Sequence, residues 1–352
     1  MRLYRRLVLL ALLLTVVVVV FGAYVRLADA GLGCPDWPGC YGQLSPHHAA
    51  EEIGTAHAAD PHGPVSPAKA WKEMLHRYLA AGLGLLILAM AVLAWRHRRH
   101  AGSAPGVATA LVGVVLIQGL LGKWTVTLLL KPAIVTGHLL GGLTVLALLS
   151  WMALRAHGAR RRTQRVPPGL ALAARVGFVL LIAQIALGGW TSTNYAALAC
   201  PDFPACHGSF YPPADYGHAF HLVRELGMTA DGELLPLAAL TAIHWSHRVG
   251  AAVVGGFLLL VGGLLLRRDA LPGIVLIAAV VLQIVLGVAN VLLSLPLPLA
   301  VAHNAGAALL VAVMVWINWR VAGEGRACRA PVSDFAAGAR VLALRRIGNG
   351  RG

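Results

Sequence analysis

Charged residues are scarce in this sequence, and acidic residues are the scarcest. Only 12% of the 352 residues are charged, against roughly 25% in soluble globular domains. Lysine and arginine number 29, aspartate and glutamate only 14, whereas hydrophobic residues make up 58% of the chain. This shortage of charge excludes an ordinary soluble domain and indicates an integral membrane protein.

Long apolar runs recur along the whole chain. About 20 apolar residues cross a hydrocarbon core of roughly 30 Å as a helix, and a spanning segment must satisfy its own backbone groups. The first run has too long an apolar core and no small-residue cleavage site for a signal peptide. We therefore predict an all-α integral membrane protein with eight transmembrane helices at residues 7–26, 74–95, 107–129, 133–154, 171–192, 242–266, 272–293 and 299–320.

The basic excess, a formal net charge of +15, lies in alternate loops. Such a distribution is the positive-inside bias of membrane proteins, and it predicts that both termini are cytoplasmic in a multi-pass protein of the bacterial inner membrane. The same distribution argues against a nucleic-acid partner and leaves membrane lipid as the surrounding phase. The arginines concerned are Arg2, Arg5, Arg6, Arg96, Arg98, Arg99, Arg155, Arg160, Arg161, Arg162, Arg165, Arg267 and Arg268.

The chain contains an internal duplication. Residues 34–42 (CPDWPGCYG) recur as residues 200–208 (CPDFPACHG), and Gln118 and His138 recur at nearly the same offset as Gln283 and His303. Two halves with four spans each have the same orientation, so a pseudo-two-fold axis along the membrane normal is expected. The predicted parts are an N-terminal four-helix bundle (1–154), a basic linker (155–170), a C-terminal four-helix bundle (171–321) and a tail (322–352).

Four histidines lie just inside the outer ends of spans that run inward: His76, His138, His247 and His303. At ~1.5 Å per residue they share one depth. Two per half fit two bis-imidazole sites of the kind that haem iron accepts, whereas no ligand trio with zinc spacing appears in either half. The alternative is that they make interhelical hydrogen bonds.

Charged neighbours accompany two of these histidines. Arg77 and Arg248 directly follow His76 and His247, and their planar guanidinium groups are candidates for pairing with haem propionates. Glu73 precedes His76 by one helical turn, whereas His244 occupies the matching place in the second half. An acid at the membrane edge is costly to bury and suggests acid–base chemistry. The alternatives for Glu73 are a salt bridge with Lys72 or Arg77, or a favourable helix-dipole interaction.

The remaining motif is a pair of cysteines in each long outer loop, Cys34/Cys40 and Cys200/Cys206. The periplasm is oxidising, and the prolines between the cysteines favour a tight turn that closes a disulfide. A structural bond of this size contributes about 2–3 kcal/mol. A redox-active pair is the alternative. Cys328, in the tail, is expected to be a free thiol.

Together, the Glu-x-x-His-Arg sequence of residues 73–77, the paired loop cysteines, the duplication and the four helix histidines resemble the haem A synthase family over roughly residues 5–321. The resemblance implies an oxidoreductase that oxidises the C8 methyl group of haem O to a formyl group, making haem A for terminal cytochrome oxidases.

It also implies roles for individual residues. His247 and His303 would ligate a haem B cofactor, His76 and His138 would serve the substrate haem O, and Glu73 would be the catalytic carboxylate. Cys200–Cys206 would be the loop disulfide, and Cys34–Cys40 matches a pair present in part of the family. The expected partners are the haem O synthase (a protohaem farnesyltransferase) and the cytochrome oxidase assembly pathway, and a homo-oligomer is left open.

Two other classes of protein compete with this interpretation. A non-catalytic dihaem electron carrier would often place its haems near both membrane faces, whereas all four histidines here lie near one. A transporter built from repeats would favour broken helices and charged residues at mid-span, and the span centres contain almost none.

Overall fold

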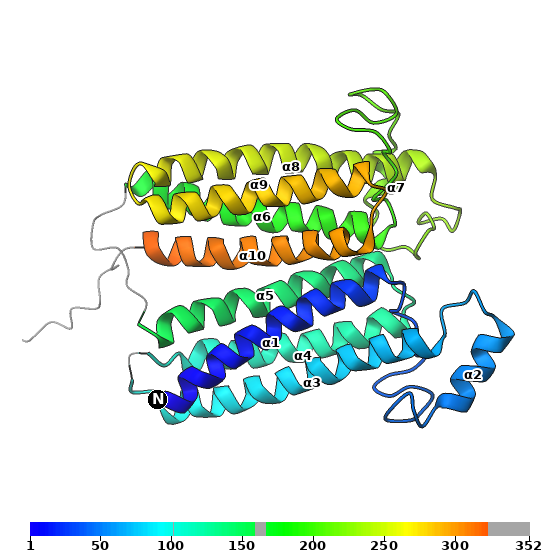
Figure 1. The fold of residues 1–352 in the computed structure, drawn as a ribbon, viewed down its shortest axis with the longest axis horizontal. Coiled ribbons are helices and arrows are strands. Elements are labelled where there is room, and N and C mark those ends of the chain that lie inside the picture. Colours follow the sequence, from blue (N-terminus) through cyan, green and yellow to red (C-terminus); the bar gives the residue numbers. More distant parts are fainter. Residues whose placement is uncertain (101, 159–166, 323–352) are drawn as a thin grey trace, which may run out of the picture.

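The computed structural model describes residues 1–100, 102–158 and 167–322, and they fold as a bundle of long helices (Figure 1). Eight of these helices are long and apolar enough to cross a membrane. This confirms the predicted all-α class and each of the eight predicted spans. Their bounds are α1 Arg2–Leu27, α3 Pro67–Arg96, α4 Pro105–Thr127, α5 Pro132–Ala156, α6 Pro168–Thr193, α8 Leu237–Leu266, α9 Ala270–Leu292 and α10 Leu297–Val321.

Most of these helices begin earlier than the apolar runs. Helices α3, α4, α5 and α6 each have a proline at the first helical position, where a missing N–H is harmless and the fixed φ suits a helix. In α3 the Ser66 side chain also accepts a hydrogen bond from the Lys69 N–H. Helix α3 therefore starts at Pro67 instead of residue 74, which places Glu73 and His76 well inside a regular helix.

The helices of each half contact one another in a closed ring. In the first half α1 packs on α3, α3 on α4, α4 on α5 and α5 on α1; in the second half α6, α8, α9 and α10 repeat this order. The halves meet through α1, α5, α6 and α10, and exchanging the halves leaves the pattern of contacts unchanged. The direction of the axis between the halves stays a prediction.

Helix α5 belongs to both hydrophobic cores. Its residues Val145 and Leu149 are buried in the core of the first half, whereas Leu143 and Leu146 on its other side are buried in the core of the second half. The two halves are thus packed directly against each other and are not connected by the linker alone. Residues 159–166 of the predicted linker and 323–352 of the predicted tail, with Cys328, lie outside the described residues.

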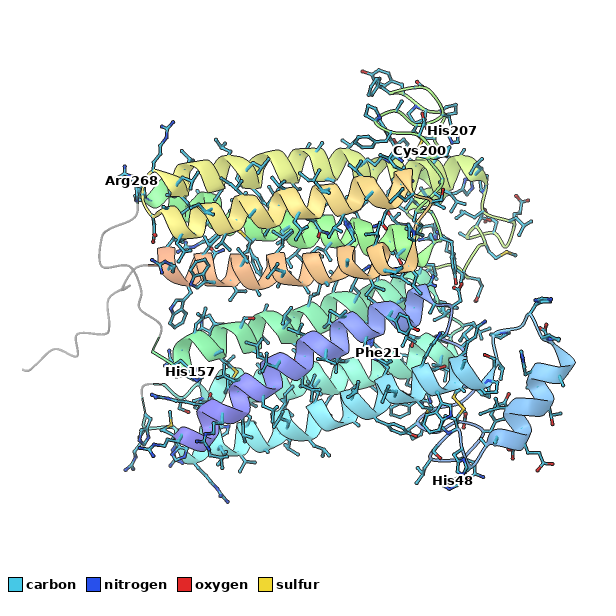
Figure 2. The ribbon with its side chains drawn as sticks, viewed as in Figure 1. Phe21, His48, His157, Cys200, His207 and Arg268 are labelled. Carbon is cyan, nitrogen blue, oxygen red and sulfur yellow. A yellow bond between two sulfur atoms is a disulfide. The ribbon has the colours of Figure 1, made fainter. Side chains whose placement is uncertain are left out.

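Both long loops lie at one end of the bundle, here called the loop end (Figure 1). They carry two short helices that hydropathy did not predict, α2 (Ala50–Ala59) and α7 (Tyr216–Ala219). The opposite end, with His157 and Arg268, is called the arginine end (Figure 2). Both predicted disulfides are formed, with S–S distances of 2.09 Å for Cys34–Cys40 and 1.95 Å for Cys200–Cys206.

Candidate functional site

The two cysteine loops have the same local fold. The Asp36 carboxylate accepts hydrogen bonds from the N–H groups of Tyr41 and Gly42, both at 2.7 Å. The Asp202 carboxylate accepts them from His207 at 2.7 Å and Gly208 at 2.8 Å. These bonds, led by the one from Gly208, lower the pKa of the Asp202 carboxyl below its usual value.

The backbone conformation of the loops explains part of the duplicated sequence. Tyr41 and His207 have positive φ, as do the glycines that follow them, and Trp37–Pro38 and Phe203–Pro204 are cis peptide bonds. Glycine adopts positive φ without steric penalty. The duplicated motif therefore encodes a tight loop that presents its carbonyl groups to the helices below.

An arginine holds each loop from beneath. Arg77 Nη1 donates to the carbonyls of Asp36 at 2.9 Å and Pro38 at 3.2 Å, and also to Gly39. Arg248 Nη1 donates to Asp202 at 2.7 Å and Ala205 at 2.8 Å, while Nη2 donates to Cys200 at 2.6 Å. The loops thus use Nη1 of Arg77 and both Nη atoms of Arg248, and the pairing of these arginines with propionates stays a prediction.

Glu73 and His244 occupy equivalent places under these loops. Glu73 Oε2 accepts from the Cys34 N–H at 3.0 Å, and Oε1 pairs with Arg77 Nη2 at 2.5 Å. His244 Nδ1 lies 3.1 Å from the Cys200 N, and its Nε2 lies 3.2 Å from Arg248 Nε, so that its single acceptor nitrogen takes a hydrogen bond from one of these two donors. The structure therefore contains the salt bridge between Glu73 and Arg77 that the sequence offered as an alternative role for Glu73.

Lys72 makes a different contact. Its Nζ lies 5.2 Å from the centroid of the Tyr24 ring, which is within the range of a cation–π interaction. Of the two basic residues considered as partners for Glu73, the structure therefore brings Arg77 to the carboxylate.

A cavity of about 590 Å³ opens beside Glu73. Its walls come from α1, α3, α4 and α5 and include Glu73, His76, Arg77 and His138. It reaches the second half at Gly189, Ser192 and Thr193 of α6 and at Asn304 of α10. The structure thus brings the predicted carboxylate and two predicted histidines to one mostly apolar cavity of a size typical for ligand sites.

Each of the four histidines faces a glycine on a neighbouring helix. A Cβ atom at Gly22 would lie 2.7 Å from Cε1 of His76, and one at Gly122 would lie 3.4 Å from Cε1 of His138. The corresponding distances are 2.9 Å between Gly188 and His247, and 3.1 Å between Gly287 and His303. Because glycine has no side chain, there is room for an imidazole ring between two helices at each of these places.

These imidazoles are suited to ligation. Within the described residues, the Nδ1 atoms of His76, His138 and His303 are buried without a hydrogen-bond partner, which is uncommon in folded proteins. His76 and His138 line the same cavity, and His247 and His303 hold the matching places on α8 and α10. The donor set is therefore two imidazoles per half, and it fits a haem iron. No group of three or more His, Cys, Asp or Glu side chains in the described ranges is arranged to hold a metal ion.

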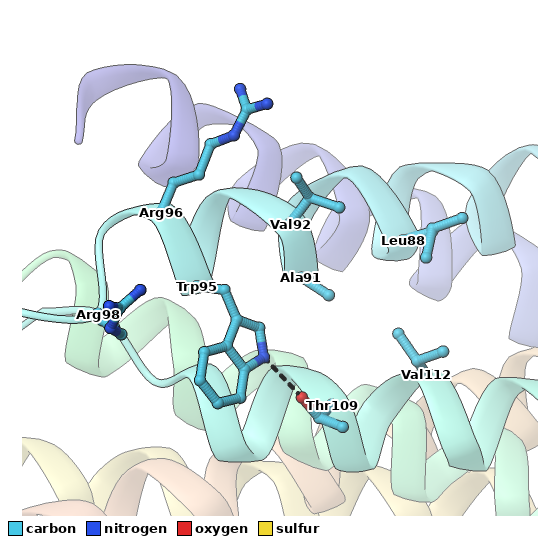
Figure 3. Close-up of a pocket in the computed structure, with 8 residues that line it drawn as sticks. All are labelled: Leu88, Ala91, Val92, Trp95, Arg96, Arg98, Thr109 and Val112. Atoms are coloured by element: carbon cyan, nitrogen blue, oxygen red, sulfur yellow. Dashed lines mark hydrogen bonds between the residues drawn. The ribbon is translucent and has the colours of Figure 1, made fainter.

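A second depression lies near the arginine end, between α3 and α4 (Figure 3). Apolar residues such as Leu88 and Val112 line it, and Trp95 Nε1 donates to Thr109 Oγ1 at 3.0 Å. None of the predicted site residues borders this depression, so the candidate site is the cavity at the loop end.

Sequence reasoning gave no role to three glutamines that contact the histidine-bearing helices. Gln184 and Gln283 hydrogen bond with His247 and His303, and the Gln118 amide lies against Gly141. The sequence does mark these glutamines by a regular spacing, because each one precedes by four residues a glycine that faces a histidine.

The sequence is similar to one family of known proteins. The family description "Cytochrome oxidase assembly protein" (COX15-CtaA) matches residues 5–315. A heme A synthase of Shewanella oneidensis is 41% identical over 88% of this chain and 94% of its own length. Those of Caulobacter vibrioides and Sphingopyxis alaskensis are each 30% identical, over 86% of this chain and over 91% and 87% of their own lengths.

Proposed function

Because the chain belongs to the COX15-CtaA family of cytochrome oxidase assembly proteins, we propose that it is a haem A synthase. Its reaction would be the oxidation of the C8 methyl group of haem O to a formyl group, as the sequence resemblance implies, and its relatives are named heme A synthases. The observation that carries the proposal is the position of Glu73. It is a buried carboxylate at a cavity with two histidines, in the one half of a duplicated protein that has an acid there.

The first half is the substrate site in this proposal. His76 and His138 would hold the iron of haem O, because both line the same cavity and both have an unpartnered Nδ1 within the described structure. The cavity walls are mainly apolar, as a porphyrin ring requires. Bound haem iron supplies the redox chemistry, while the chain orients the ring and limits access of water.

The second half is the cofactor site. His247 and His303 would ligate haem B, because they occupy the matching places on α8 and α10 and face matching glycines. His244 replaces the carboxylate there, so this half lacks the negative charge that Glu73 supplies in the first half. The second half would then supply or accept electrons, and the first half would bind and oxidise the substrate.

Glu73 would act on the substrate as a proton acceptor or as a negative charge beside the carbon that is oxidised. Its carboxylate is 6% exposed and is oriented by Arg77 and by the Cys34 N–H. A positioned carboxylate of this kind contributes typically 10²–10⁴-fold to a rate by general acid–base catalysis.

We further propose that the protein lies in the bacterial inner membrane with both termini in the cytoplasm. The arginine end then faces the cytoplasm, and the disulfide loops face the oxidising periplasm. The two bundles would be related by a pseudo-two-fold axis along the membrane normal. A haem O synthase is the expected partner, since haem O is an apolar product that would pass from one membrane enzyme to the next. A homo-oligomer stays an open alternative.

The second candidate function is a non-catalytic dihaem electron carrier, which the presence of two histidines in both halves favours. The test is to purify the chain from cells that co-express a haem O synthase and to identify the extracted haems by chromatography. Haem B together with haem O or haem A supports the synthase. About two haem B molecules per chain, with no haem O or haem A, would favour the carrier.

A further inference from the structure

A glutamine lies against three of the four histidine-bearing helices at the same place. The sequence Gln-x-x-x-Gly occurs in α4 at Gln118, in α6 at Gln184 and in α9 at Gln283. The facing helices α5, α8 and α10 carry His-x-x-Gly at His138, His247 and His303. The glycines of the His-x-x-Gly sequences are Gly141, Gly250 and Gly306, and a Cβ atom at each of them would overlap the amide of the glutamine on the facing helix. We call this arrangement the glutamine clamp.

The clamp is fully engaged in the second half. Gln184 Nε2 lies 2.9 Å from His247 Nδ1 and donates to the carbonyl of His247 at 2.9 Å. Gln283 Nε2 lies 3.3 Å from His303 Nε2 and donates to the carbonyl of His303 at 3.0 Å. Each amide therefore fixes both the ring and the backbone of a histidine on the adjacent helix.

The clamp is incomplete at one histidine of the first half. At His138 the Gln118 amide is present, and it differs from the other two in that its Nε2 atom faces Gly141, whereas the Oε1 atoms of Gln184 and Gln283 face Gly250 and Gly306. At the fourth histidine both parts of the motif are missing, because Val18 stands four residues before Gly22 and Leu79 stands three residues after His76. Val18 and His76 line the same cavity, and the described structure leaves His76 Nδ1 without a partner.

We propose that the glutamine clamp determines which half retains its haem and which half releases it. Gln184 and Gln283 are positioning residues that hold His247 and His303 ready for a permanent cofactor. The absence of the clamp at His76 makes the first half an exchangeable site, as a substrate and product site must be. This inference rests on the proposed haem ligation and adds to it the residues that separate retention from release.

The chemistry of the amide supports this role. A glutamine side chain carries both a donor and an acceptor, so it can pair with an imidazole in either tautomer. The Oε1 atoms of Gln184 and Gln283 are buried and have no partner in the described structure. They face Gly250 and Gly306, and a half-turn of the amide would bring each Oε1 to the ring, where it could accept an N–H from an imidazole whose other nitrogen binds a metal. Partners of this kind orient a ligating histidine and raise its basicity, and their loss typically lowers metal affinity 10- to 100-fold.

The first test removes the hydrogen bonds without changing side-chain volume much. Gln184→Met and Gln283→Met are purified with haem B bound, and the transfer of haem to excess apomyoglobin is followed by absorption. We expect release about 10- to 100-fold faster than from the wild type. The midpoint potential of haem B should also become more positive, because a ligand without its hydrogen-bond acceptor donates less charge to iron.

Two matched variants serve as controls. Gln118→Met removes the corresponding amide in the first half, so release of haem B from the second half should stay as in the wild type. Asn318→Leu removes an amide that donates to the carbonyls of Ala174 and Met314 on α6 and α10, near the arginine end. It should likewise leave the haem B potential unchanged.

The second test builds the missing clamp. In the double variant Val18→Gln/Leu79→Gly, haem in the first half should be released more slowly, while release from the second half stays the same. Wild-type release rates and potentials in Gln184→Met and Gln283→Met would overturn the inference, as would an equal effect of Gln118→Met on haem B in the second half. A wild-type protein without haem B would instead contradict the proposed function itself.

Discussion

Glu73 and His244 accept the same hydrogen bond in the two halves of the protein, from Cys34 N–H at 3.0 Å and from Cys200 N–H at 3.1 Å. Both also lie beside the arginine four residues later. Either side chain can thus hydrogen bond a cysteine loop to the helix below it, and this is its structural task. The acid in the first half is not needed for that task, which leaves its charge available for chemistry.

This equivalence allows Glu73 to be tested without destroying the loop. Glu73→His places in the first half the side chain that performs the structural task in the second. We expect the variant to fold and to keep haem B, but to lose haem A formation by about 100-fold or more, because the imidazole lacks the negative charge of the carboxylate, and a positioned catalytic group contributes 10²–10⁴-fold. Haem A per mole of protein is measured by extraction from cells that make haem O.

The control for this variant is Glu51→His, which changes an exposed acid in α2 outside the cavity. It should make haem A at the wild-type level. Wild-type haem A in Glu73→His would show that the carboxylate has no catalytic role.

The ligand assignment predicts different losses in the two halves. His303→Ala should purify without haem B, because one of its two axial imidazoles is gone. His138→Ala should keep haem B and lose bound haem O or haem A. The haem content of each variant is read from pyridine haemochrome spectra, and unchanged haem B in His303→Ala would refute that ligand.

The glycines opposite the histidines predict a steric effect. Gly188→Ala would place a methyl group 2.9 Å from His247 Cε1, closer than a carbon–carbon contact of about 3.5–4.0 Å. The ring must shift, so we expect most haem B to be lost. Gly22→Ala, at 2.7 Å from His76 Cε1, should impair haem A formation while haem B remains.

Gly256→Ala is the matched control, since a Cβ there meets nothing within 4 Å. Its haem content and thermal unfolding should equal those of the wild type. Retention of full haem B by Gly188→Ala would show that the ring does not occupy this place when haem is bound.

The loop disulfides predict a loss of stability. The pair of substitutions Cys200→Ser/Cys206→Ser opens a short closed loop and should lower stability by about 2 kcal/mol, seen as earlier thermal unfolding in detergent. Haem A formation at low temperature should persist if the bond is structural. A complete loss of activity with unchanged unfolding would instead identify a redox-active pair.

Most of the scaffold was predictable from the sequence. Apolar runs of membrane length predicted all eight long helices, because the bilayer leaves a spanning chain few alternatives. The repeat of residues 34–42 as 200–208 predicted two loops of one kind, and both disulfides followed. The two short helices, α2 and α7, escaped prediction because they lie in polar loops where hydropathy carries no signal.

The relations across helices could not be read from the sequence. Nothing in the order of residues shows that Gln184 reaches His247, that Gly22 leaves room for His76, or that Asn304 of the second half borders the cavity of the first. Hydropathy and spacing determine which segments span and at what depth their histidines lie. Rotation and neighbourhood of the helices depend on side-chain packing between distant segments, so only the tertiary structure decided which residues meet.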